Sequence, residues 1–152
     1  MEPVTPVAAG ERAVAFTTVV DAPAAEVFAL LANPHRHHEV DGSGSVKQQV
    51  IGPRELRAGD KFRTSMRMAA VPYAMTNTVT RVETDRLVEW RHVGGHLWRW
   101  EFEDLGEGRT RVTETFDAST SRVPFAMRLI RAYERNATGI ERSLRRLQQR
   151  FA

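Results

Sequence analysis

Hydrophobic and polar residues alternate in short stretches over most of the chain, and a period of three to four residues replaces this alternation near its end. The first stretch, 13–20 (AVAFTTVV), is rich in β-branched residues and predicts a strand. A helix is predicted next, because Asp21 suits an N-cap, Pro23 suits a first turn and an apolar face follows. Pro34 ends this helix, since the residue before a proline disfavours the α conformation.

Six further strands are predicted, separated by turns that contain glycine, proline or aspartate. The chain then ends in one long helix, about 124–151, in which apolar residues recur at alternating spacings of three and four. A run of antiparallel strands followed by a long amphipathic helix is an α+β design, with helices on one face of the sheet. The six strands are expected at 45–51, 61–69, 73–83, 86–93, 97–104 and 109–117.

The length of 152 residues fits one domain with a single packed core. Residues 1–12 contain two prolines and no apolar run, so they are predicted to be a flexible lead-in that is neither a signal peptide nor a helix. The single domain is then expected over 13–152. No apolar run reaches the roughly 18 residues that predict a membrane span.

Composition excludes several classes of function. Cysteine is absent, which removes disulfides, thiolate catalysis and sulfur-ligated metals and favours a cytoplasmic protein. The net charge of +3 is lower than a nucleic-acid-binding domain normally carries, so no nucleic-acid partner is predicted. No phosphate loop or dinucleotide fingerprint is present, and no cofactor is predicted.

The sequence leaves open whether the protein is a monomer or a homodimer, and whether the arginine-rich face of the final helix meets water, a membrane or a protein.

Several segments resemble one known superfamily. They are 19–34 (VVDAPAAEVFALLANP), the DGSG at 41–44, the W-x-F at 100–102, the G-x-T-x-V-T-E at 108–114 and the long final helix. Together they are similar to START-like, or SRPBCC, proteins, and most similar to the polyketide cyclase/dehydrase-type branch. The resemblance covers about 13–151. It implies a helix-grip fold, in which a curved antiparallel sheet of about seven strands wraps around the C-terminal helix with a hydrophobic cavity between them.

For function, the resemblance implies binding of a hydrophobic small molecule (aromatic, polyketide or lipid-like) in that cavity. The alternative is a cyclase, aromatase or dehydratase in which polar groups of the cavity act as acid and base. Such chemistry needs a positioned acid/base pair in a site that excludes water. Glu114 and His92 are the candidates for that pair.

Strand parity predicts which side chains face the cavity, since side chains alternate across a strand. A three-residue loop at 94–96 would place three rows of side chains on the concave face. The rows are His92–Trp98–Phe116, Trp90–Trp100–Glu114 and Val88–Phe102–Val112. The predicted lining residues are Met66, Met68, Trp90, His92, Trp98, Trp100, Phe102, Glu114, Phe116, Leu129, Ala132, Asn136 and Gly139.

Two residues of this set allow two interpretations each. A carboxylate at Glu114, beside two tryptophans, would be desolvated, and its pKa should rise unless a cation or hydrogen-bond donors meet it. It is either a structural pair near the rim of the sheet or a polar group that a ligand meets. Gly139, inside the final helix, permits either a close backbone approach to the sheet or space for a ligand.

Three histidines, His35, His37 and His38, lie within four consecutive positions after the first helix. Neighbouring residues of a regular element do not face one point, and no second cluster of ligands completes a site, so no metal is predicted. The three histidines are instead predicted to lie at the portal of the cavity. Because the unperturbed pKa of histidine is about 6.5, the charge of that portal would depend on pH.

Overall fold

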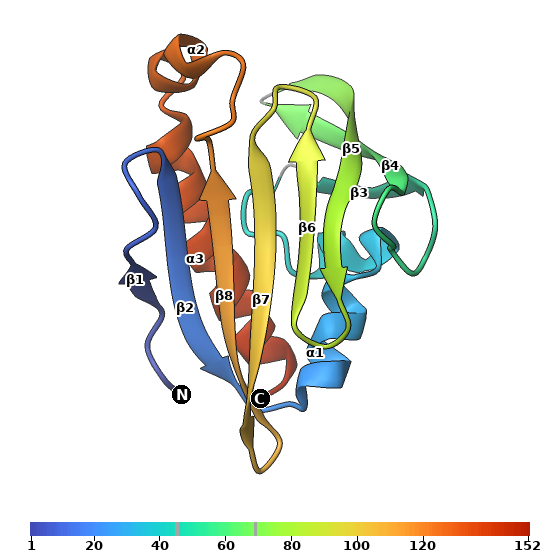
Figure 1. Cartoon of the computed structure of the whole chain (residues 1–152), viewed down its shortest axis with the longest axis vertical. Helices are drawn as coiled ribbons and strands as arrows, with labels where there is room; N and C mark the ends of the chain where they lie inside the picture. The colour runs from blue at the N-terminus through green and yellow to red at the C-terminus, as the bar shows by residue number, and fades with distance from the viewer. Residues whose placement is uncertain (45, 69) are drawn as a thin grey trace.

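The computed structural model describes residues 1–44, 46–68 and 70–152, without the side chains of Gln48, Met68 and Leu129. In this part of the chain eight strands form one antiparallel sheet, in the order β1-β2-β8-β7-β6-β5-β4-β3 (Figure 1). The elements are β1 (Thr5–Val7), β2 (Ala13–Val20), α1 (Ala24–Leu31), the 3₁₀ helix η1 (Pro34–Glu39), β3 (Val46–Ile51), β4 (Lys61–Met68), β5 (Val71–Glu83), β6 (Leu87–His92), β7 (Leu97–Gly106), β8 (Arg109–Asp117), α2 (Pro124–Leu129) and α3 (Ala132–Arg150).

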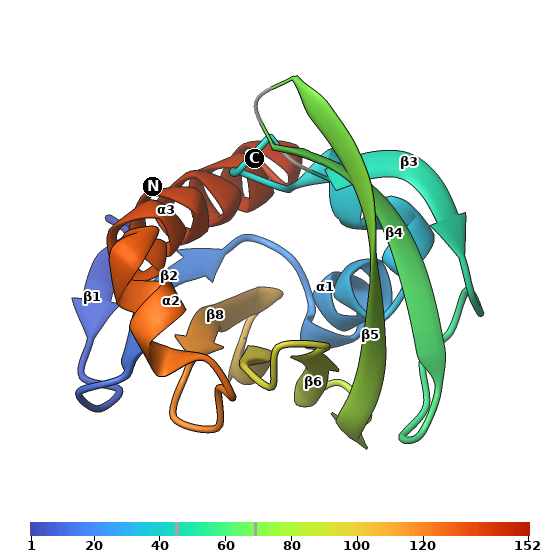
Figure 2. The ribbon, with the colours of Figure 1, turned by 90° about the horizontal axis from the view of Figure 1, so that it is seen from above.

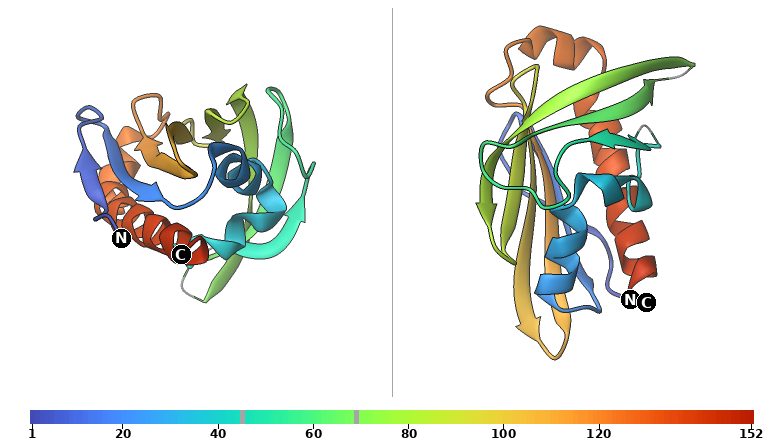
Figure 3. Two further views of the ribbon diagram at one scale, coloured as in Figure 1. Left: turned by 90° about the horizontal axis from the view of Figure 1, so that it is seen from below. Right: turned by 90° about the vertical axis from the view of Figure 1, so that its right-hand side faces the viewer.

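The sheet curves so that its concave face turns toward α3 and α1, as the views in Figures 2 and 3 show. The α3 helix packs on β2 and β8 and contributes Ile140, Leu144 and Leu147, which are almost completely buried. The α1 helix packs on β6, β7 and β8. This arrangement confirms the predicted α+β helix-grip fold. None of the helices in the described residues combines the length and apolar character needed to cross a membrane.

Most strands lie where the alternation predicts them. The predicted strands 45–51 and 61–69 each include one residue, Ser45 and Ala69, that lies outside the described residues. The lead-in 1–12 contains a strand that the sequence analysis missed, because β1 pairs with β2 through Thr5–Thr17 and Val7–Ala15. This added edge strand explains why the sheet has eight strands instead of about seven.

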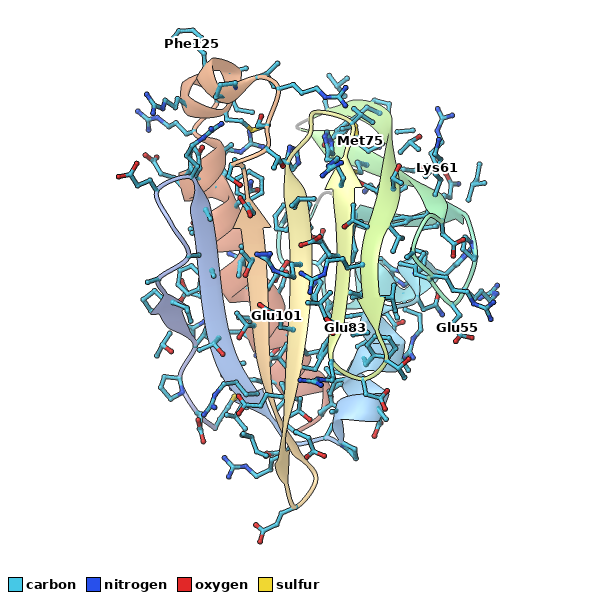
Figure 4. The ribbon with its side chains drawn as sticks, viewed as in Figure 1. Glu55, Lys61, Met75, Glu83, Glu101 and Phe125 are labelled. Carbon is cyan, nitrogen blue, oxygen red and sulfur yellow. The ribbon has the colours of Figure 1, made fainter. Side chains whose placement is uncertain are left out.

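The single final helix predicted over 124–151 is wrong, because the chain breaks into α2 and α3. Arg131 adopts the left-handed conformation, with φ of 55°, and this redirects the backbone. Met127 of α2 is buried, whereas Phe125 is 78% exposed and projects away from the body of the molecule (Figure 4). The sequence around Arg131 contains no glycine or proline to signal a break. The apolar period also continues across it, so the pattern predicts one helix.

The predicted register is correct between β7 and β8, where Trp98 lies opposite Phe116 and Trp100 opposite Glu114. It is wrong by two residues between β6 and β7, where Trp90 lies opposite Trp98. The cause is the hairpin loop, which is 93–95, because the His92 amide donates to the carbonyl of His96 at 2.9 Å. A shift of two residues keeps every side chain on its face of the sheet.

Candidate binding cavity

A cavity of about 600 Å³ lies between the concave face of the sheet and α3. Tryptophans and phenylalanines from four strands line it, and Met66 and Met75 of β4 and β5 add to this apolar wall. The aromatic residues are Phe62, Trp90, Trp98, Trp100 and Phe116. Strand alternation delivers them all to one face, which is why parity alone could identify most of them.

Ten of the predicted lining residues form part of the wall of this cavity. Phe102 does not, because its ring packs edge-on against Phe28 of α1, with 5.9 Å between the ring centroids. The α1 helix covers that end of the concave face, so parity assigned the correct face but not the correct surroundings. The side chains of Met68 and Leu129 lie outside the described residues. The ten are Met66, Trp90, His92, Trp98, Trp100, Glu114, Phe116, Ala132, Asn136 and Gly139.

Glu114 on β8 is the buried carboxyl of the cavity, with only 6% of its surface exposed. Its Oε2 atom is buried and has no hydrogen-bond partner in the part of the chain that the structure describes. Burial raises the pKa of this carboxyl well above its usual value, and the negative charge of Asp41 raises it further. These effects favour the neutral acid, which offers one O–H donor to the cavity.

Two histidines from the β6–β7 hairpin stack on each other in the wall, with 4.1 Å between the ring centroids of His92 and His96. Burial lowers the pKa of both, to about 4 for His96, where His92 adds a smaller effect. The Gly94 amide donates to Nδ1 of His92 at 3.0 Å, so the proton of that neutral ring lies on Nε2. His96 was missed because the predicted loop included it; placing the loop one residue earlier would have identified it.

The structure places the three clustered histidines in different surroundings. His37, predicted at the portal, has its ring in the cavity wall, where it stacks on Trp90 with 5.0 Å between the ring centroids. Its Nε2 donates to the carbonyl of Leu31 at 2.7 Å, and burial lowers its pKa to about 4. His35 and His38 lie outside the cavity wall, and Nε2 of His35 contacts the carbonyl of Gly52 at 2.8 Å.

A 3₁₀ helix explains this divergence, because consecutive side chains leave it about 120° apart. The structure brings together no group of three His, Cys, Asp or Glu side chains that could hold a metal ion, as far as residues 1–44, 46–68 and 70–152 are concerned.

The loop after η1 closes the cavity against α3 through Gly42. Its amide donates to Oγ of Ser143 at 2.8 Å. A Cβ atom at this position would lie 2.4 Å from the carbonyl oxygen of Gly139, so only glycine fits. A Cβ atom on Gly139 itself would make an ordinary contact of 3.7 Å with Ser43. The close backbone approach is therefore that of Gly42, within the DGSG segment, to α3, and not the approach of Gly139 to the sheet that the sequence allowed.

Comparisons with known proteins agree with this architecture. A family model described as "Polyketide cyclase / dehydrase and lipid transport" matches residues 11–152. The uncharacterized protein Rv0088 of Mycobacterium tuberculosis is 44% identical over 158 residues, which span the whole of this chain and 70% of that protein.

Two solved structures show the same fold at low sequence identity. A protein from Rhodobacter sphaeroides has a TM-score of 0.74 and 17% identity, covering 97% of this chain and 96% of its own. The ZhuI aromatase/cyclase from Streptomyces sp. R1128 has a TM-score of 0.65 and 17% identity, covering 93% of this chain and 96% of its own. With the match to the family model over nearly its whole length, the chain belongs to the polyketide cyclase / dehydrase and lipid transport family.

Proposed function

We propose that this protein binds a hydrophobic small molecule with a planar, aromatic or polyketide-like body, or a lipid-like one, inside the cavity. The observation that carries the proposal is a cavity of about 600 Å³ with an aromatic wall and an unpartnered buried carboxyl, Glu114. Cavities of about 300–1,000 Å³, mostly apolar with a few polar groups, are typical of small-molecule sites.

The chemistry of the wall supports a ligand with one or more oxygen atoms on an apolar frame. Aromatic rings stack on planar apolar groups, and methionines adapt to their outline. A buried polar atom without a partner is costly, so a ligand carbonyl or hydroxyl that meets Glu114 would remove that cost. Thr64 and Asn77 add two further buried polar side chains to the wall.

Probe binding tests this proposal. The neutral fluorophore N-phenyl-1-naphthylamine should bind with one-to-one stoichiometry and quench tryptophan emission, because Trp90, Trp98 and Trp100 line the cavity. A native mass spectrum of protein purified from its own host should then show a bound small molecule. Failure of several such probes to bind would mean that the cavity does not accept ligands.

One variant links the binding to the cavity. Gly139→Leu places a side chain at the wall, so probe affinity should fall sharply while stability holds, since leucine is the better helix former. Gln149→Leu, at the exposed end of α3, is the matched control and should leave probe affinity unchanged. A strongly destabilised Gly139→Leu protein with unchanged affinity per folded molecule would remove Gly139 from the ligand site.

A second candidate function is acid/base catalysis of the cyclase, aromatase or dehydratase type. It is favoured by opposite pKa shifts in one cavity: the pKa of the Glu114 carboxyl is raised and the pKa values of His92 and His96 are lowered, so burial favours the neutral form of all three groups. A neutral acid can donate a proton and a neutral imidazole can accept one. No hydrogen bond joins Glu114 to His92 in the described residues, so a substrate would have to lie between them.

Deuterium exchange into the methyl group of acetophenone, followed by NMR in D₂O, separates the two candidates. A catalyst that enolises bound ketones should accelerate the exchange, and Glu114→Gln should abolish the acceleration. Glu89→Gln, a buried glutamate outside the cavity wall, should leave it intact. No acceleration by the wild-type protein, with normal probe binding, would support binding alone.

A further inference from the structure

Two arginines of α3 form part of the rim of the cavity. Arg135 and Arg142 both line it and are both exposed. Their spacing of seven residues places them on the same face of the helix, about 10 Å apart along its axis. A ligand that leaves the aromatic wall toward this rim would therefore meet two guanidinium groups.

These two arginines differ from others on the same helix. Arg145 pairs with Glu141 at 2.6 Å, and Arg150 pairs with Glu39 at 2.8 Å. Neither Arg135 nor Arg142 forms a side-chain hydrogen bond or an ion pair with any residue that the structure describes. Their guanidinium donors are thus available to a group outside the protein.

The acidic residue of the rim, Asp41, already has partners of its own. Its carboxylate accepts hydrogen bonds from the amide and hydroxyl of Ser43 and from the amide of Val46, at 2.7–3.1 Å. These bonds shape the loop after η1. Asp41 therefore stabilises the loop instead of pairing with either arginine.

The opposite side of the rim offers a further hydrogen-bond donor. Tyr73 of β5 lines the cavity, and burial raises the pKa of its phenol, while the positive charge of Arg135 partly opposes this effect. The phenol therefore keeps its O–H. Arg135 and Tyr73 come from α3 and from the sheet, so donors approach the rim from two elements.

We propose that this rim binds an anionic group of the ligand, so that the ligand is an amphipathic anion with an apolar body and a carboxylate, sulfonate or phosphate. The proposal rests on the proposed function and makes it more specific. Charge-assisted hydrogen bonds from arginine suit such anions, and an exposed rim keeps the charged group in contact with water. The apolar body would lie among the tryptophans.

Two probes that differ by one anionic group test the proposal. 8-Anilinonaphthalene-1-sulfonate carries a sulfonate that N-phenyl-1-naphthylamine lacks. The sulfonate probe should bind the wild-type protein about tenfold more tightly than the neutral probe at low salt, and this advantage should shrink at 0.5 M NaCl. Competition between the two should be one-to-one, because both would occupy the same cavity.

Variants assign the effect to the rim. Replacing both arginines, Arg135→Gln with Arg142→Gln, should weaken binding of the sulfonate probe roughly tenfold, because two exposed charged contacts are lost. Binding of the neutral probe should change by less than about twofold. Arg145→Gln removes the same charge from the same helix but not from the rim, and should leave both affinities unchanged.

Three competitors with the same twelve-carbon chain and different polar groups identify the anion. Dodecanoate and dodecyl phosphate should displace the neutral probe at lower concentrations than dodecanol, and the order of the two anions assigns a carboxylate or a phosphate. Equal potency of all three, or equal loss in the Arg145→Gln control, would overturn the anionic rim while leaving the cavity as a binding site. Failure of every probe, the neutral one included, would instead overturn the proposed function.

Discussion

Two glutamates, equally buried on opposite faces of one sheet, show how different the two faces are. Glu89 on β6 is 5% exposed and Glu114 on β8 is 6% exposed. On the convex face, Glu89 accepts hydrogen bonds from Oγ1 of Thr80 at 2.8 Å and from Arg99 at 3.2 Å. On the concave face, Oε2 of Glu114 has no partner among the described residues.

This difference between Glu89 and Glu114 shows that burial alone does not determine the role of an ionisable residue. Buried polar groups in proteins are normally hydrogen-bonded, and Glu89 follows that rule. The cavity departs from it twice, because Nδ1 of His96 is also buried without a partner in the described chain. We infer that Glu89 helps to hold the sheet together, whereas Glu114 and His96 are available for hydrogen bonds to a ligand of the kind proposed above.

The largest effect is expected on the convex face. Glu89→Ala should lower the free energy of unfolding by about 3 kcal/mol, because it removes two hydrogen bonds and leaves Arg99 without its buried partner. Glu101→Ala is the matched control: Glu101 lies 3.8 Å from the same arginine but is exposed and points outward from β7 (Figure 4), so about 0.5 kcal/mol or less is expected. Urea denaturation measures both, and equal losses would contradict the difference between the faces.

An acid-dependent effect is expected at His96. Its pKa is lowered to about 4 in the folded protein, so its contribution to stability is complete above pH 6.5 and is lost as the pH falls toward 4. Linkage gives a loss of about 2 kcal/mol at pH 5 relative to pH 8. His96→Phe should remove that part of the pH dependence, measured as the difference in unfolding free energy between the two pH values. A variant with the same acid sensitivity as the wild type would show that His96 is not buried in its neutral form.

Glu114 should show the opposite dependence on pH. Its pKa is raised in the folded state, so its contribution is complete below pH 4.5 and is lost as the pH rises through the folded value. Within that window the slope is at most about 1.4 kcal/mol per pH unit. Glu114→Gln should remove the slope, and the variant should gain stability over the wild type as the pH rises from 4.5. If Glu114→Gln instead destabilises the protein at every pH, the carboxyl has a structural partner.

The sequence predicted on which face of the sheet a side chain lies better than it predicted what packs against that side chain. Alternation in 97–104 and 109–117 was sufficient to place Trp100 beside Glu114 and to predict the raised pKa, because a period of two is a property of any strand. It could not tell that α1 covers Phe102, since that depends on packing between elements distant in sequence. The contrast between paired and unpaired glutamates was also invisible, because partners come from neighbouring strands.

The other features that the sequence did not predict depend on local backbone conformation. The β6–β7 register depended on which three residues form the loop, and both choices contain a glycine pair. The break at Arg131 depends on a left-handed residue that costs roughly 1–2 kcal/mol and has no sequence signal at a non-glycine position. The DGSG segment did carry a signal for Gly42, but the structure was needed to show that the partner is α3.

The smallest effect is expected at Thr80, where one of the two bonds to Glu89 is removed. Thr80→Val keeps the shape of the side chain but removes the donor to Oε1 of Glu89. Arg99 still holds the other oxygen, so about 1 kcal/mol should be lost, and Thr80→Ser, which retains a hydroxyl, should restore most of it. Urea denaturation of Thr80→Val, Glu89→Ala and the double variant gives the coupling between the two residues. Additive losses would mean that the Thr80 hydroxyl does not hold Glu89, and the paired side of the comparison would then rest on Arg99 alone.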